Sequence, residues 1–204
     1  MKRFNELPIE YQCDEVKYYY DILSKKKLSL VLTRIFDICV SLGLLVLLSP
    51  ILLIIAIWIK ADSKGPVFFR QERITTYGKT FRIFKFRTMK VENAGTSITL
   101  KNDDRITKVG HKIRKARIDE LPQLLNILTG DLPLVGTRPE VKKYVDAYSK
   151  EMLATLLLPA GVTSLASIKF RDEDELMQGV TDIDNFYIER ILPEKMKYNL
   201  EAIE

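Results

Sequence analysis

The pattern of hydrophobic and charged positions is dominated by one long apolar run. From Ile38 to Ile59, 22 consecutive residues carry no charged side chain. As a straight helix this run would be about 33 Å long, roughly the thickness of the bilayer hydrocarbon. Three structures are compatible with such a run: a helix that spans a membrane, a helix buried in a protein core, or a segment that enters the bilayer and returns.

Two features of the run favour re-entry over spanning. Ser49-Pro50 lies near its middle, where proline lacks a backbone donor and bends a helix, and the Ser49 hydroxyl can satisfy a freed carbonyl. A spanning helix normally has its excess of lysine and arginine on one side. Here both flanks are basic, which fits two ends that face the cytoplasm: Lys25, Lys26, Lys27 and Arg34 before the run, and Lys60, Lys64, Arg70 and Arg73 after it.

The polar pattern on either side of the run suggests three segments. Residues 1–28 are polar and rich in tyrosine and lysine, and we expect an N-terminal arm that is amphipathic or partly ordered. Residues 29–37 mix apolar side chains with Arg34 and Asp37, as in a helix that lies shallow in the membrane interface. We therefore expect an arm (1–28), a membrane anchor (29–62) and a catalytic domain (63–204).

Alternating apolar and basic residues downstream predict a small β-hairpin. Its strands would be Val67–Arg73 and Phe81–Arg87, joined by a turn at Tyr77–Lys79. Residues 91–104 suggest a loop, and residues 141–158 and the stretch from Leu192 suggest helices. The resulting fold class is α/β, rich in helix with a small β-hairpin, and carries a helix-break-helix anchor.

A further helix is predicted by apolar residues at i, i+3, i+4 and i+7, namely Leu121, Leu124, Leu125 and Leu128. Pro122 suits its first turn, and the residue before a proline, Leu121, is expected to be non-helical. Asp119 and Glu120 would then lie just outside a helix N-terminus, where backbone donors attract anions.

Composition narrows the partners. The chain has 204 residues, 47% of them hydrophobic and 29% charged, which suits one compact domain or a small domain with an anchor. A net charge of +5 suggests phosphates, nucleotides or acidic lipid headgroups, while 27 acidic residues argue against nucleic acid. The two cysteines, Cys13 and Cys39, are far apart and predict neither a disulfide nor a zinc site.

The acidic pair Asp119 and Glu120 is the leading candidate for chemistry. An acidic pair before a helix is usually a cap. Four nearby cations, which could bind one phosphate, favour a functional site, because a carboxylate can be a nucleophile towards phosphorus or a magnesium ligand. The cations are Lys112, Arg114, Lys115 and Arg117.

Other basic residues have two interpretations each. Arg82, Lys85 and Arg87 suit a solvated strand face, or alternatively Lys85 and Arg87 contact diphosphate oxygens. Arg138 lies in a Gly-x-Arg-Pro turn, which would hold its guanidinium fork in one orientation. Asp172 to Glu175 suits a solvated acidic edge.

Taken together, these motifs resemble the bacterial sugar transferases, the monotopic phosphoglycosyl transferases, over about Arg34 to Ala166. The apolar segment with its central Ser-Pro comes first. It is followed by Phe68–Arg73 (FFRQER), Phe84–Met89 (FKFRTM), Ile113–Asn126 with its Asp-Glu-Leu-Pro-Gln, Gly130–Pro139 and Gly161–Thr163.

The resemblance implies a re-entrant anchor and a catalytic domain on the cytoplasmic face of the bacterial inner membrane. It implies transfer of a sugar 1-phosphate from a nucleotide sugar, commonly a UDP-sugar, to polyprenyl phosphate such as undecaprenyl phosphate. The reaction would use Mg²⁺ and start the assembly of a glycoconjugate such as a capsule, exopolysaccharide, O-antigen or protein-linked glycan.

By the same resemblance, Asp119 is the nucleophile and a magnesium ligand, and Glu120 assists proton handling or activates the acceptor. Substrate and phosphate contacts are implied for Arg114, Lys85, Arg87, Arg138, Gly136, Gln71 and Arg73. Membrane lipid is a further partner, nucleic acid is not, and a homo-oligomer is one of the assemblies considered.

Some positions depart from the family pattern. The usual Gly-Pro-Arg-Pro has Thr137 in its second position, and the later Pro-Gly-x-Thr-Gly-Leu-Ala-Gln has Ala160, Ser164 and Ser167. Two rival functions are considered besides phosphoglycosyl transfer. One is a membrane phosphohydrolase, and the other is a non-enzymatic scaffold that binds acidic lipid.

Overall fold

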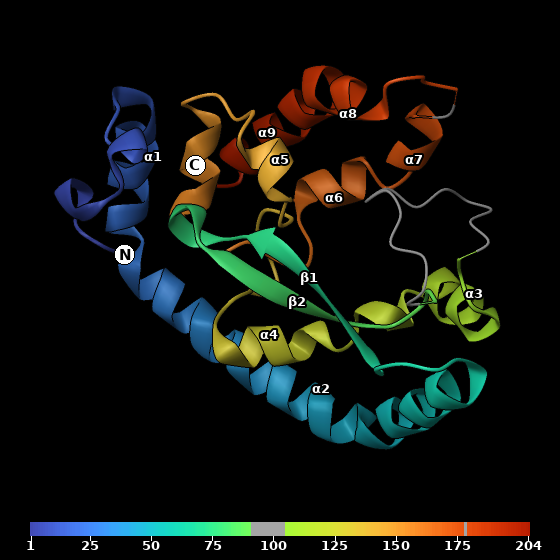
Figure 1. The fold of residues 1–204 in the computed structure, drawn as a ribbon. Helices are drawn as coiled ribbons and strands as arrows, with labels where there is room; N and C mark the ends of the chain where they lie inside the picture. The colour runs from blue at the N-terminus through green and yellow to red at the C-terminus, as the bar shows by residue number, and fades with distance from the viewer. Residues whose placement is uncertain (91–104, 178) are drawn as a thin grey trace. The chain divides into compact units, whose positions relative to one another are not determined.

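A computed structural model describes residues 1–90, 105–177 and 179–204 and shows a helix-rich chain with one hairpin (Figure 1). The predicted loop over 91–104 lies outside the described residues. The helices are α1 (Asp14–Lys25), α2 (Lys27–Asp62), α3 (Lys108–Lys115), α4 (Gln123–Thr129), α5 (Lys142–Val145), α6 (Leu165–Lys169), α7 (Glu173–Leu176), α8 (Ile183–Phe186) and α9 (Leu192–Glu201).

The predicted hairpin is confirmed. Strands β1 (Phe68–Ile74) and β2 (Thr80–Phe86) pair in a two-stranded sheet and are joined by a 3₁₀ turn at Thr76–Gly78. The turn needs positive φ at both Tyr77 (56°) and Gly78 (74°), and Gly78 adopts this without a Cβ penalty. An α-rich fold with a small sheet is thus the observed class.

The apolar run lies in α2, which continues through Pro50 without a break. Proline cannot donate to the carbonyl four residues earlier, which is that of Val46. The Ser49 hydroxyl donates to this carbonyl at 2.8 Å, as the sequence suggested. The predicted helix-break-helix is therefore corrected to one continuous helix, α2 (Figure 1).

By length and composition, α2 is long and apolar enough to cross a membrane. Its most apolar window of 18 residues has a mean hydropathy of 2.9, and 11% of that window is buried in the protein. A core helix would be mostly buried, so the low burial argues against that alternative. Residues 29–37, expected as a separate interfacial helix, form the first part of α2.

Two compact units make up the described chain, and each is described by itself. Their boundaries differ from the three segments expected from the sequence. The first unit contains Met1–Asp37, Glu72–Phe81 and Thr129–Glu204, and the second contains Ile38–Gln71 and Arg82–Leu128.

The N-terminal arm is an integral part of the first unit. Helix α1 buries Val16, Tyr19 and Leu23, and the turns before it bury Leu7 and Tyr11. These side chains form one cluster with residues of β1, of the 3₁₀ segment Met152–Leu157 and of the C-terminal part of the chain, namely Ile74, Ala154, Leu156, Leu157, Leu200 and Ile203. Burial of this kind is worth about 1.5–3 kcal/mol for each large apolar side chain, so the arm stabilises the unit.

The helix expected over residues 141–158 is wrong in extent. The structure has α5, which ends at Val145, and then the 3₁₀ segment Met152–Leu157. The 3₁₀ segment buries four consecutive residues, Ala154 to Leu157, and so it does not have one apolar face as an amphipathic α-helix does.

In the second unit, the C-terminal half of α2 is a packing platform. Ile55 and Ile59 of α2 cluster with Phe86 of β2 and with Val109 and Ile113 of α3. Side chains of α2 therefore pack directly against α3 and against the end of strand β2.

Candidate active site

The acidic pair lies in a 3₁₀ turn, Ile118–Glu120, between α3 and α4. Arg117 precedes the turn with φ 53° and ψ 22°, a left-handed conformation that is uncommon for a residue with a side chain. Backbone strain of this kind often marks functional sites. The expectation that Leu121 is non-helical is wrong, because its φ is −55° and its ψ is −34°, which continues the turn towards α4.

Strand β2 delivers a cation to the acidic pair. Lys85 Nζ lies 2.8 Å from Glu120 Oε1, and these side chains are 19% and 18% exposed. An ion pair that is so little exposed is less screened than a surface pair. The contact places Lys85 beside the acidic turn, while the expected contact of Lys85 with a diphosphate stays a prediction.

Asn126 fixes α4 against β2. Its side chain is 1% exposed. The amide accepts a hydrogen bond from the Phe84 backbone N–H at 2.8 Å and donates one to the Arg82 carbonyl at 3.0 Å. The side chain thereby takes the place of a neighbouring strand, and it sets the distance between Lys85 and the acidic turn.

The buried side of α4 differs from the predicted leucine face. The helix begins at Gln123, and its buried residues are Gln123, Leu124, Asn126 and Ile127, whereas Leu125 is half-buried. Gly130, with φ 93°, follows the last residue of the helix, as expected.

Helix α3 brings Arg114 towards the site and is held at its N-terminus. The Thr107 hydroxyl accepts from Gly110 N at 2.9 Å, and Asp62 at the end of α2 accepts from Val109 N at 3.1 Å. A Cβ at Gly110 would lie 2.2 Å from the Thr88 carbonyl oxygen, so only glycine permits this approach of helix to hairpin.

The charges around Asp119 act on its pKa in opposite directions. Burial raises the pKa above the ordinary value and is the largest influence, and the neighbouring Glu120 raises it further. The positive charges of Lys85 and Arg114 lower it. The carboxyl group is thus partly desolvated but surrounded by cations that favour its ionised form.

Arg87 points away from the role expected of it. Its side chain is 4% exposed, and its guanidinium donates to the carbonyls of Ser63 and Lys64, just beyond the last turn of α2. Cations are favourable at helix C-termini. These contacts indicate that Arg87 holds the C-terminal end of α2 in place. They give no support to a phosphate contact of Arg87, which stays a prediction.

The turn with Gly136 and Arg138 lies in the first unit and packs closely against the turn at Gly161. The Gly136 N–H donates to the Thr163 carbonyl at 2.9 Å, and the Gly161 N–H donates to the Thr137 carbonyl at 2.7 Å. A Cβ on Gly161 would lie 2.1 Å from Gly136 N. Glycine is therefore required at position 161 for the backbones to meet, and position 136 leaves little room for a Cβ.

The residues that differ from the family pattern form hydrogen bonds with nearby residues. The Ser164 hydroxyl accepts from Ser167 N at 3.0 Å and caps α6, a role that suits serine. The Ala160 N–H donates to the Thr75 hydroxyl at 3.1 Å in a buried setting. Thr137 keeps its backbone contact with Gly161, so the turn is formed without the usual proline.

Sequence reasoning missed a buried polar network behind the Arg138 turn. Glu140 accepts a hydrogen bond from the Tyr187 hydroxyl at 2.6 Å, and Lys195 donates to the same hydroxyl at 2.9 Å. Lys195 also pairs with Glu173 at 2.9 Å, which corrects the expectation that Asp172 to Glu175 is only a solvated edge. Lys195 is one lysine in an amphipathic stretch, and no local signal distinguishes it.

Arg73 and Gln71 come from β1. Arg73 Nη1 donates to the Pro139 carbonyl at 3.4 Å, so Arg73 supports the turn that carries Arg138. Burial lowers the pKa of its guanidinium, and the charge of Glu140 opposes that change. Gln71 is half-buried and belongs to the second unit.

The carboxylates available for a metal ion are few. Within residues 1–90, 105–177 and 179–204, no group of three or more His, Cys, Asp or Glu side chains converges as a ligand set. Mg²⁺ is usually held by one or two carboxylates together with substrate phosphates. Asp119, whose carboxyl group is half-buried next to Glu120, fits that minimal set.

Comparison with known proteins gives relatives over most of the chain. The chain is 41% identical over 157 residues to UDP-glucose:undecaprenyl-phosphate glucose-1-phosphate transferase of Klebsiella pneumoniae, covering 74% of this chain and 34% of that protein. It is 40% identical over 143 residues to the uncharacterized sugar transferase EpsL of Bacillus subtilis strain 168, covering 70% and 71%. It is 44% identical over 121 residues to UDP-N-acetylgalactosamine-undecaprenyl-phosphate N-acetylgalactosaminephosphotransferase of Aeromonas hydrophila, covering 58% and 29%.

The extent of these matches differs between relatives. The chain spans about a third of the Klebsiella protein and about 70% of the Bacillus protein. Residues 28–196 match the family model described as bacterial sugar transferase, which includes the acidic turn, the hairpin and the Arg138 turn. The chain therefore belongs to the bacterial sugar transferase family.

Proposed function

We propose that the protein is a membrane-associated phosphoglycosyl transferase. It moves a sugar 1-phosphate from a nucleotide sugar, a UDP-sugar, to polyprenyl phosphate, and so starts the assembly of a lipid-linked glycan. Relatives named for transfer of glucose 1-phosphate or N-acetylgalactosamine phosphate to undecaprenyl phosphate support the reaction class. Because those names differ in the sugar, the sugar of this chain is left to experiment.

The observation that carries the proposal is the half-buried Asp119 next to the Lys85–Glu120 ion pair. In the first half-reaction the Asp119 carboxylate attacks the β-phosphorus of the donor. The bond from that phosphorus to the bridging oxygen breaks, and the nucleoside monophosphate leaves with the electron pair. The enzyme then carries the sugar phosphate as an acyl phosphate on Asp119.

In the second half-reaction an oxygen of polyprenyl phosphate attacks the same phosphorus. The bond to Asp119 breaks, the carboxylate is released, and the product is a polyprenyl diphosphate sugar. Glu120 is the candidate to accept a proton from the incoming phosphate, and its ion pair with Lys85 holds it beside the nucleophile.

Cations have two proposed tasks. Lys85 and Arg114 keep Asp119 ionised and offset the negative charge of the donor diphosphate. Arg138 binds a phosphate from its turn, where Gly136 permits the close backbone approach and Arg73 braces Pro139. Gln71 remains a predicted substrate contact.

Mg²⁺ is part of the proposal, with Asp119 as its protein ligand. When bound, it would screen the repulsion between the carboxylate and the diphosphate. Activity is expected to be lost in excess chelator and to return with added Mg²⁺.

The membrane arrangement is proposed from α2. Its apolar residues are exposed along the helix, including Leu42, Val46, Leu47 and Ile54. Basic residues flank both ends, and Pro50 lies within the helix, where proline favours a bend; both features support a re-entrant anchor with both ends on the cytoplasmic side. A soluble nucleotide donor and a lipid-borne acceptor would then meet at the inner face of the bacterial membrane.

The proposal is tested by incubating the full chain in membranes with undecaprenyl phosphate and a panel of nucleotide sugars. Release of nucleoside monophosphate together with a lipid diphosphate sugar is expected for one or few donors. Release of free sugar phosphate without acceptor would indicate a phosphohydrolase instead. If none of the nucleotide sugars is turned over, and Asp119→Asn keeps full function in cells, the protein is a scaffold instead.

A further inference from the structure

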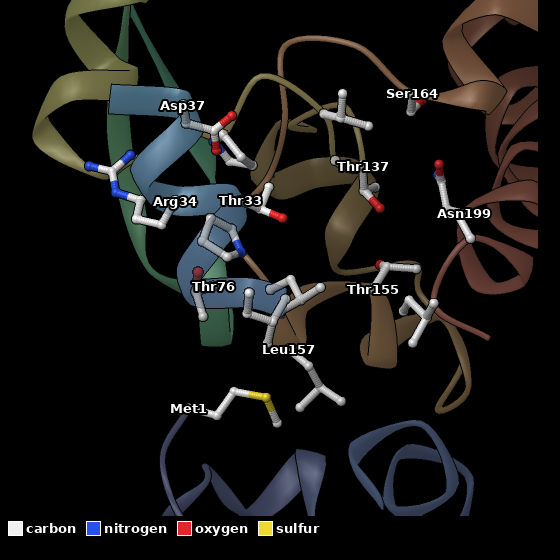
Figure 2. Close-up of a pocket in the computed structure, with 18 of the residues that line it drawn as sticks. Met1, Thr33, Arg34, Asp37, Thr76, Thr137, Thr155, Leu157, Ser164 and Asn199 are labelled. Atoms are coloured by element: carbon white, nitrogen blue, oxygen red, sulfur yellow. The ribbon is translucent and has the colours of Figure 1, made fainter. Parts of the chain in front are cut away.

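The first unit contains an open cavity of about 620 Å³, and Gly136 is the one residue of the proposed chemistry among the residues that line it. Small-molecule pockets in proteins range over about 300–1,000 Å³, so this cavity has the size of a binding site. Only Lys2, Arg34 and Asp37 among its lining residues carry a charge. Apart from the amide of Asn199, the other lining side chains are apolar or carry a hydroxyl, as Figure 2 shows for Leu157 and Thr137.

One wall of the cavity is the first part of α2. Leu30, Thr33, Arg34 and Asp37 line it, at the i, i+3, i+4 and i+7 spacing of one helix face. The other faces of the same turns expose large apolar side chains: Val31 is 56% exposed, and Leu32, Ile35 and Phe36 are also exposed. An apolar helix face of this kind favours contact with a membrane interface. One helix therefore separates the cavity from the surface that we assign to the bilayer.

The charges in the cavity do not favour a nucleotide. Arg34 and Asp37 have opposite sign, and Asp37 is 2% exposed and accepts from Leu134 N at 3.4 Å. The Arg34 guanidinium extends to within 3.4 Å of a Cβ built on Gly130. Lys2 is the other charged side chain of the lining, so most of the cavity wall would give a buried diphosphate no compensating cation.

Several lining residues lie outside the stretch shared with the family. The family match covers residues 28–196, whereas Met1, Asn199, Ala202 and Ile203 line the cavity from both ends of the chain. The family departure Thr137 faces the cavity as well (Figure 2). The cavity is thus completed by parts of this chain that the family model does not include.

We propose that this cavity holds part of the isoprenoid chain of the polyprenyl phosphate acceptor. The inference rests on the proposed function, because it assigns a place to that acceptor. Gly136 and Thr137 line the cavity and directly precede Arg138, so one lipid can place its phosphate at Arg138 and its chain in the cavity. A polyprenyl phosphate has one chain and a bare phosphate, which suits a single apolar cavity beside one cation. A phospholipid has two chains and a bulkier headgroup.

Photocrosslinking of the natural full chain in membranes tests the site directly. The probe is a polyprenyl phosphate with a diazirine in its isoprenoid chain. Labelled peptides are expected from residues 133–137 and 199–203, and an excess of undecaprenyl phosphate should remove the label. Label confined to residues 38–59, or label that competitor does not remove, would overturn the proposal. Equal labelling of the cavity by a phospholipid with a diazirine acyl chain would also overturn it.

A pair of tryptophan substitutions gives a kinetic test. Ala202 is exposed and lines the cavity, whereas Ala147 is exposed in the same unit and is not among the lining residues. Ala202→Trp should raise the KM for undecaprenyl phosphate about tenfold, the equivalent of losing two buried methylenes. Its effect on a two-isoprene acceptor phosphate should be small. Ala147→Trp should match the natural protein with both acceptors.

The outcomes separate the cavity from the reaction. If the natural chain transfers sugar phosphate to no polyprenyl phosphate, the proposed function fails. Thermal unfolding first establishes that Ala202→Trp is folded. If transfer then proceeds, and Ala202→Trp has the same KM values for long and short acceptors as Ala147→Trp, only the cavity assignment fails.

Discussion

The reaction needs Asp119 as an ionised carboxylate, because only that form attacks phosphorus, whereas burial raises the pKa of Asp119 and favours the neutral form. A carboxyl group with a raised folded-state pKa contributes stability that is present below its unfolded pKa and lost as pH rises through the folded pKa. At neutral pH that contribution is absent, and the partly buried, ionised carboxylate lowers the free energy of unfolding. Removing the charge with Asp119→Asn should therefore leave the protein at least as stable while it abolishes transfer.

Lys85→Gln should move the acid limb of the pH profile to higher pH. Lys85 lowers the pKa of Asp119, so its loss leaves the effects of burial and of Glu120 unopposed by that charge. The measurement is kcat/KM against pH with a saturating acceptor. Lys79→Gln, at an exposed position of the hairpin turn, is the control and should leave the limb in place. If the acid limb of Lys85→Gln is unchanged or moves to lower pH, Lys85 does not lower the pKa of the carboxyl group that limits the reaction.

Asn126→Ala tests the link between β2 and α4. It would leave the Phe84 N–H and the Arg82 carbonyl without their buried partner, at a cost of about 1–3 kcal/mol each. Denaturant unfolding should show that loss, and transfer should fall further than stability alone explains because Lys85 and the acidic turn lose their fixed distance. Asn185→Ala, at an exposed position, should change the free energy of unfolding by no more than about 0.5 kcal/mol.

At the scale of elements, α2 combines a membrane task with a structural one. Its C-terminal half packs against α3 and β2, and Arg87 and Asp62 connect its end to the hairpin and to α3. The position of the acidic turn in this unit thus depends on the same helix that we assign to the membrane.

Pro50→Leu should shift the anchor towards spanning. Leucine restores a backbone donor to the Val46 carbonyl and removes the cause of the bend. Cysteines placed at Ser29 and Ala61, in a chain lacking Cys13 and Cys39, would report the side of each flank through an impermeant thiol reagent. Both flanks should react from the cytoplasmic side when Pro50 is present, and Ile51→Leu should not alter this. Opposite sides with Pro50 in place would contradict re-entry.

Local sequence signals predicted elements better than they predicted contacts. The hairpin and the stop of α4 at Gly130 follow from alternation and from glycine, which act over a few residues. The break at Pro50 was predicted but the helix continues, because the Ser49 hydroxyl replaces the missing donor. The burial of Asn126 and the contacts of Arg87 with the end of α2 depend on partners 23 to 44 residues away, which no local pattern encodes.

At the scale of the molecule, segments from both ends of the sequence stabilise the first unit. Helix α1 and the C-terminal helix share one apolar cluster, and Lys195 of α9 lies in a buried network with Glu140, Tyr187 and Glu173. Residues 1–28 appear in the sequence as a separate polar arm, because the apolar side chains that they bury are widely spaced. Their partners are Ile74 and residues near the C-terminus, all far away along the chain.

Lys195→Met should lower the free energy of unfolding by about 3 kcal/mol or more, because it removes the cation that pairs with buried Glu140 and with partly buried Glu173. Lys197→Met is the matched control on the same helix, where the lysine is 64% exposed and pairs with Glu194. That exposed pair is worth about 0–1 kcal/mol. Equal effects of the two substitutions in chemical denaturation would show that the network does not stabilise the unit.

The central claim is a bond between an oxygen of Asp119 and phosphorus, and peptide mass spectrometry of the quenched protein tests it most directly. The full chain, mixed with its UDP-sugar and Mg²⁺ but no lipid acceptor, is quenched within the first turnover and digested. We expect a mass increase of one sugar phosphate on the peptide with Asp119, its loss on addition of undecaprenyl phosphate, and no adduct in Asp119→Asn. Accumulation of lipid product with no adduct on Asp119 at any time would contradict the account.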